Sequence, residues 1–125
     1  MIFGIGTDIV AVARMEEFLA RHGERGLEKI LALEERPECA ASKQPARLLA
    51  KRFAAKEAFG KAIGTGVRAP ATLPAIAVCH DAHGKPLFAF APELAAYLDE
   101  RGLSAHLSIS DERDYAVAFV VVERK

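Results

Sequence analysis

Two carboxylates in this sequence stand where their neighbours suggest chemistry. Glu57 lies in the stretch RFAAKEAFGKAIGTG, and Asp8 ends the glycine-bearing segment GIGTD near the start of the chain. The cations around Glu57 are Arg52, Lys56 and Lys61. Magnesium often takes only one or two protein carboxylates and completes its octahedron with water and phosphate oxygens, while nearby cations hold further phosphate charge. The pattern therefore suggests a magnesium site for a phosphate-bearing ligand.

The same residues also have a purely structural interpretation. Glu57 and Lys61 are one helical turn apart, so they could form a surface ion pair worth about 0.3 to 0.5 kcal/mol. Asp8 could cap the helix that follows it. Arg52 and Lys56 could belong to a solvated basic face. Spacing alone leaves both interpretations open.

Other catalytic motifs are missing. GIGTDI lacks the third glycine of a dinucleotide fingerprint, and Gly60-Lys61 lacks the upstream glycine of a phosphate loop. The four histidines have no metal-ligand spacing, and no serine lies in a nucleophile elbow. Cys39 and Cys79 form no CxxC pair, so no zinc site is expected.

The composition predicts a single globular domain over residues 1–125, a length that buries roughly two-thirds of the unfolded surface. The 17 basic and 17 acidic residues cancel, which argues against a dedicated nucleic-acid binder. The apolar start MIFGIGTDIVAV has no basic leader and contains Asp8, so a buried strand is expected rather than a signal peptide. No segment reaches transmembrane length. We expect a cytoplasmic protein that does not bind membranes.

Hydrophobic periodicity predicts the elements that carry the two acids. A strand over 2–10 places Gly4, Gly6 and Asp8 on one face, where the glycines indicate close approach of a partner element. A long helix over 45–63 carries Glu57; it begins with a proline, ends at Gly64, and has a predicted buried side of Leu48, Leu49, Phe53, Phe59 and Ile63.

Between them, a helix over 12–25 and a short helix over 27–33 are predicted, followed by an irregular segment, ERPECAASKQP. The first helix has two stripes: a predicted core stripe of Val12, Met15, Leu19 and His22, and an opposite stripe of Arg14, Phe18, Arg21 and Arg25. The C-terminal half predicts a hairpin, IAVCH with PLFAF, then a helix in PELAAYLDERG, with proline first and glycine after it, then a second hairpin, SAHLSIS with YAVAFVVVE. This order predicts an α+β domain, an antiparallel sheet with helices on one side.

GIGTDIVAVARME and RFAAKEAFGKAIGTG resemble the two signatures of the holo-acyl-carrier-protein synthases, in the 4'-phosphopantetheinyl transferase superfamily. The resemblance continues through HDAHGKPLF and HLSISDERDYAVAFVVVE to the end of the chain. It implies that family's fold, an antiparallel sheet packed against a long helix and shorter helices. It also implies transfer of 4'-phosphopantetheine from coenzyme A to a serine of apo acyl carrier protein, in fatty acid biosynthesis, with release of adenosine 3',5'-bisphosphate.

The resemblance assigns roles to individual residues. Asp8 and Glu57 fall at the family's Mg²⁺ positions, and Lys61 falls in the coenzyme A site, where Arg52 and Lys56 are further candidates. The base that takes the serine proton could be Glu57, a metal-held water or Lys56. One departure stands out, because Ser110 is followed by Asp111 where many members have histidine.

Two expectations concern partners. The stripe Arg14, Phe18, Arg21 and Arg25 would suit an acidic carrier helix with apolar residues between its charges, although it could also be an ordinary exposed face. The resemblance to the short members of the family implies a homotrimer with the active site between subunits. The strand AVAFVVV, which is apolar on both faces, is consistent with such an assembly, although a larger monomeric core would fit the same sequence. The alternative function is a coenzyme A or nucleotide-binding regulatory module without turnover.

Overall fold

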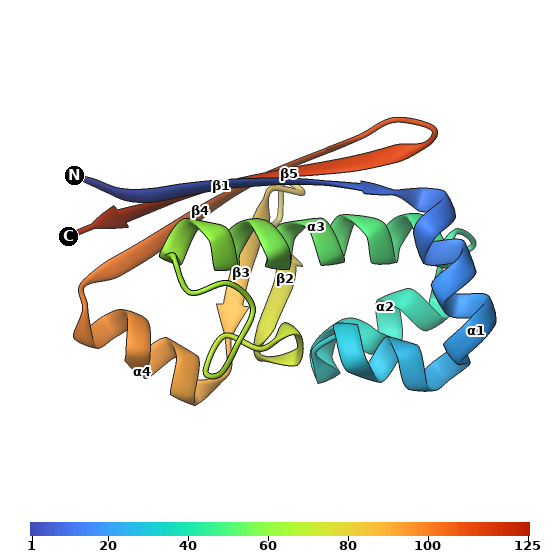
Figure 1. The fold of residues 1–125 in the computed structure, drawn as a ribbon, viewed down its shortest axis with the longest axis horizontal. Helices are drawn as coiled ribbons and strands as arrows, with labels where there is room; N and C mark the ends of the chain where they lie inside the picture. Colours follow the sequence, from blue (N-terminus) through green and yellow to red (C-terminus); the bar gives the residue numbers. More distant parts are fainter.

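A three-stranded antiparallel sheet and one long helix organise the chain (Figure 1). The sheet has the order β1 (Ile2–Ala11), β5 (Tyr115–Arg124), β4 (Leu103–Asp111). A separate two-stranded sheet pairs β2 (Ile76–His80) with β3 (Pro86–Phe90). The computed structural model describes residues 1–125. The α+β class is confirmed, but the strands form two sheets where one was expected.

The long helix α3 (Pro45–Ile63) lies along one face of the three-stranded sheet, and the β2–β3 hairpin runs across this helix (Figure 1). Pro45 occupies its first turn and Gly64 ends it with φ 86°. Leu49, Ala54 and Phe59 are fully buried. The predicted ends of this helix are confirmed, and its central position explains why it is covered on more than one side.

Strand β1 packs against α3 with almost no side chain between them. A methyl group built on Gly6 would overlap the carbonyl oxygen of Ala58, and one on Gly4 would overlap that of Ala62. Larger residues at these positions would hold the strand and helix apart. The glycines of β1 therefore mark close backbone approach, and the approaching element is the helix that carries Glu57.

Helix α1 (Val12–Ile30) is bent at Gly23, which has φ 57° and ψ −142°. The two predicted helices are thus one kinked element, followed by a short 3₁₀ turn, η1 (Leu33–Glu35). Met15 is buried as predicted, but His22 is exposed, with its ring 4.7 Å from that of Phe18. The core stripe ends early because the helix changes direction beside His22.

Three shorter elements complete the fold. The stretch predicted to be irregular contains a helix, α2 (Arg36–Ala41), because Pro37 lies in its first turn, where proline is tolerated, instead of breaking it. A 3₁₀ turn, η2 (Leu73–Ala75), precedes β2, and α4 (Pro92–Glu100) follows β3 as predicted. None of the helices is long and apolar enough to span a lipid bilayer.

The face of the three-stranded sheet that points away from α3 is uncovered, and its β1 and β5 part is largely apolar (Figure 1). Along β5, Ala118, Val120 and Val122 are fully buried, whereas the alternate residues Val117 and Phe119 are exposed. Exposed apolar side chains continue on β1, at Ile5 and Ile9. Within one chain, only one of the two apolar faces of β5 is covered.

Candidate active site

Asp8 and Lys61 meet where β1 crosses α3. The Nζ atom of Lys61 lies 3.2 Å from Oδ1 of Asp8 and donates a hydrogen bond of 2.9 Å to the backbone oxygen of Thr7. The Asp8 side chain is 20% exposed and shares its strand face with Gly6, which contacts α3. Close strand–helix packing thus places this carboxylate beside the polar side of α3.

Glu57 lies one turn before Lys61 on α3 and is half-buried. It forms no ion pair with Lys61, whose ammonium group pairs with Asp8 instead. Asp8 does not cap α1 either, since the N-cap is Ala11 and has no side-chain cap bond. Neither structural alternative for the two acids holds, and Glu57 is left with a free carboxylate.

The donor set of this place fits a hard divalent cation. The Asp8 carboxylate attracts the Lys61 ammonium, and a divalent cation at Asp8 would share or replace that contact. No group of three or more His, Cys, Asp or Glu side chains gathers anywhere in the chain to form a closed metal cage. Asp8 and the partly exposed Glu57 offer carboxylate oxygens, the ligand type that Mg²⁺ takes from proteins in ones or twos.

The expected exposed basic face of α3 is wrong at Arg52 and Lys56. Lys56 is 0% exposed, and Arg52 points to Glu38, with Nη2 2.9 Å from Oε1. Burial lowers the pKa of the Lys56 ammonium, while the adjacent Glu35 carboxylate opposes the shift. Coenzyme A contact or proton transfer would need an accessible head group, so the structure does not place Arg52 or Lys56 for either role. Helical periodicity missed this because α3 is covered on most sides.

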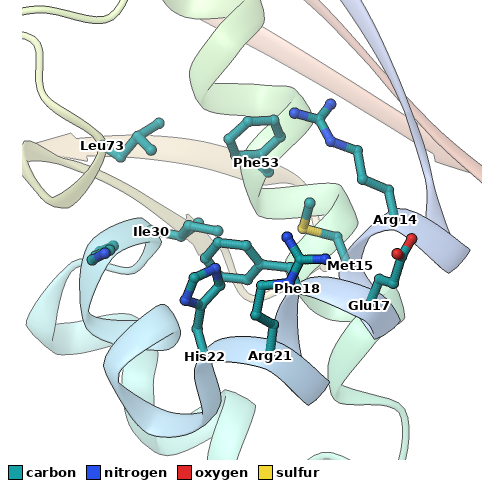
Figure 2. Close-up of a pocket in the computed structure, with 10 residues that line it drawn as sticks. Arg14, Met15, Glu17, Phe18, Arg21, His22, Ile30, Phe53 and Leu73 are labelled. Carbon is teal, nitrogen blue, oxygen red and sulfur yellow. The ribbon is translucent and has the colours of Figure 1, made fainter.

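A pocket of about 450 Å³ lies in the bend of α1. Figure 2 shows Phe18 of α1 and Phe53 of α3 directed toward the same hollow, with Arg14 and Arg21 at its edge. The Arg14 guanidinium carbon lies 5.1 Å from the centroid of the Phe53 ring. The predicted stripe thus holds together for Arg14, Phe18 and Arg21. Arg25 follows the kink and does not line the pocket.

The turn between β4 and β5 is tied down by Arg47, which the sequence did not single out. Its Nη1 lies 3.0 Å from Oδ2 of Asp111 and 2.6 Å from the backbone oxygen of Glu112, and its Nη2 donates to the oxygen of Arg113 at 2.9 Å. Asp111 therefore has a partner that anchors the hairpin to the start of α3. His106, earlier in β4, has its Nε2 atom 2.6 Å from Oε1 of Glu123.

Comparison with known proteins gives one consistent result. Residues 4–120 match the family model described as the 4'-phosphopantetheinyl transferase superfamily. The holo-[acyl-carrier-protein] synthase of Azoarcus sp. (strain BH72) is 63% identical over the full length of both chains. The crystal structure of holo-[acyl-carrier-protein] synthase from Neisseria meningitidis superposes with a TM-score of 0.96 at 47% identity, covering 99% of this chain and 100% of that one. The Bacillus anthracis str. Ames enzyme, in complex with CoA (3',5'-ADP), has a TM-score of 0.85 at 36% identity, covering 100% and 99%.

Proposed function

The chain belongs to the 4'-phosphopantetheinyl transferase superfamily, and on this premise we propose that Asp8 and Glu57 hold a magnesium ion on which its reaction depends. The reaction is transfer of 4'-phosphopantetheine from coenzyme A to a serine of apo acyl carrier protein. The observation that supports the metal proposal is the meeting of Asp8 with Lys61, one turn from the free carboxylate of Glu57.

The bound ion would neutralise charge on the pyrophosphate of coenzyme A and on the leaving adenosine 3',5'-bisphosphate. Lys61, with its head group half exposed at this place, adds a second positive charge for the same phosphates. The serine hydroxyl attacks the phosphorus that carries pantetheine, and its proton must be accepted. Lys56 cannot accept it from inside the protein, so Glu57 or a water beside it remains as the base.

Intact-mass spectrometry tests this proposal directly. Apo acyl carrier protein is incubated with the chain, coenzyme A and Mg²⁺, and a phosphopantetheine mass gain is expected that EDTA and Asp8→Ala both abolish. Transfer that continues in EDTA would reject the metal. The alternative, a regulatory binder without turnover, is not favoured by the relatives; it would require coenzyme A binding in calorimetry with no mass gain on any carrier.

The carrier would dock on the edge of the α1 pocket. Arg14 and Arg21 present positive charge on both sides of Phe18, which complements an acidic helix with apolar residues between its charges. We expect Arg14→Glu with Arg21→Glu to raise KM for the carrier about 10-fold or more while the Kd for coenzyme A is unchanged. Arg25→Glu is the control, because Arg25 lies outside the pocket and its charge reversal should have a smaller effect.

The uncovered sheet face supports a homotrimer with the active site between subunits. Val117, Phe119 and Ile5 form an exposed apolar surface, of the kind that usually meets another protein surface. We expect light scattering to return a trimer for the native chain and a monomer for Phe119→Glu, because a buried charge opposes association. Leu87→Glu, at an exposed apolar position on β3, should leave the trimer intact. A native monomer at working concentration would reject the assembly.

A cytoplasmic location and a place in fatty acid biosynthesis complete the proposal. They rest on the reaction itself, because coenzyme A and apo acyl carrier protein must both be available where the transfer occurs. Loss of holo carrier protein after depletion of this chain in cells would test the pathway.

A further inference from the structure

A buried ion pair lies next to the candidate site in the sequence of α3. Lys56, the residue before Glu57, has its Nζ atom 2.5 Å from Oε1 of Glu35. The same nitrogen donates to the backbone oxygens of Ile30, at 2.6 Å, and Leu73, at 3.1 Å. An ammonium group has three hydrogens, so all of them are used inside the protein.

The Glu35 carboxylate connects α3 to the end of α1 and to β2. Its Oε1 also accepts a hydrogen bond of 2.8 Å from the backbone nitrogen of Ala32, after the end of α1. Its Oε2 accepts one of 2.9 Å from the backbone nitrogen of Val78 in β2 and lies 3.5 Å from Nε of Arg52. We call Glu35, Lys56 and Arg52 the buried charge network. Lys56 and Glu35 are each at most 1% exposed in their side chains.

Stability does not explain why charges occupy this place. A buried ion pair gives no dependable advantage over apolar residues of similar volume, because the cost of removing charges from water offsets their attraction. Hydrogen bonds, however, are directional, so they fix the arrangement of the groups that they join more strictly than apolar contacts do. The network is therefore suited to holding α3 in one orientation.

Such a constraint is needed on α3 in particular. Its contact with β1 is made by small residues, Gly6 with Ala58 and Gly4 with Ala62, so no side chain interlocks strand and helix there. Lys56 lies about 200° around the helix from Ala58, so the network holds the side of α3 away from the sheet. Any rotation that displaced Lys56 would also displace Glu57, its neighbour in the chain.

We propose that the Glu35–Lys56 pair is a positioning device, which fixes the rotation of α3 so that Glu57 and Lys61 face Asp8. Neither residue of the pair touches substrate; both act through the helix. The inference rests on the proposed function of Glu57 as a magnesium ligand.

The test removes both charges together. The double variant Glu35→Gln, Lys56→Met keeps side-chain volume and removes both charges of the pair, while Arg52 keeps its ion pair with Glu38. We expect it to fold cooperatively by circular dichroism, with KM for the carrier unchanged but kcat lowered about 10- to 100-fold, since small displacements of catalytic groups are costly. Mn²⁺ binding, followed by electron paramagnetic resonance with coenzyme A present, should weaken about 10-fold. Glu38→Gln is the matched control, because Glu38 is an exposed acid that pairs with Arg52 and not with Lys56, and it should change neither reading.

The outcomes separate the two proposals. A folded double variant with native kcat and native Mn²⁺ affinity would overturn the positioning role alone. If Asp8→Ala bound Mn²⁺ as tightly as the native chain does, the proposed metal site itself would be overturned. If the double variant does not fold, Glu35→Asp replaces it, because the shorter acid keeps its charge but cannot reach Lys56, Ala32 and Val78 together. The same readings then decide.

Discussion

Asp8→Ala and Glu57→Gln are each expected to lower kcat/KM by about 10²-fold or more, because groups that stabilise developing phosphate charge carry much of the catalysis. Neither change should unfold the protein. Asp8 is partly exposed and its one side-chain partner is the half-exposed Lys61, while Glu57 has no ion-pair partner to lose. Exposed ion pairs contribute at most about 1 kcal/mol to stability. Both variants should therefore lose activity while their free energy of unfolding stays close to that of the native chain.

The measurement is the initial rate of carrier modification across a Mg²⁺ titration. Asp8→Asn, which keeps one oxygen donor, should need more Mg²⁺ for half-maximal rate than the native chain. Glu93→Gln is a matched control, since Glu93 is an exposed acid in the first turn of α4, remote from β1. Native rates and native Mg²⁺ dependence in Glu57→Gln would remove that residue from both of its proposed roles.

Much of the fold could be predicted because its signals are local. Pro45 and Gly64 mark the ends of α3 at their own positions. The alternation of buried and exposed side chains along β1 and β5 can likewise be predicted from neighbouring residues. The kink in α1 was harder to predict. A glycine inside an apolar helical pattern is compatible with a straight helix, with two helices or with one bent helix, and packing against the rest of the chain decides between them.

The candidate site contains residues that the sequence singles out and others whose surroundings it does not reveal. Asp8 and Glu57 stood out through their own sequence surroundings. The burial of Lys56 did not, because its partner Glu35 is 21 residues away and comes from a segment expected to be irregular. Charged side chains are assigned to the surface by default, and only the tertiary structure shows where two of them satisfy each other inside.

The second large effect is expected at a residue with no side chain. Gly6→Ala would place a methyl group against the carbonyl oxygen of Ala58 and 2.8 Å from the backbone nitrogen of Ala62. Both atoms belong to the backbone of a buried helix, so β1 must move instead. Overpacking of this kind costs about 1–3 kcal/mol, and we expect Tm to fall by about 10 °C.

That movement should also affect catalysis, because Asp8 lies two residues along the same strand. Displacement by about 1 Å can cost about 10²-fold in rate, so Gly6→Ala should lose activity even at temperatures where it remains folded. Gly84→Ala is the control for lost stability alone, since Gly84 has φ 84° in the β2–β3 turn and open space around it. If Gly6→Ala, measured well below its Tm, turned over as fast as Gly84→Ala, then close packing of β1 on α3 would not be what positions Asp8. A loss confined to Gly6→Ala would mean that the absence of a side chain at Gly6 sets the position of Asp8 relative to Glu57.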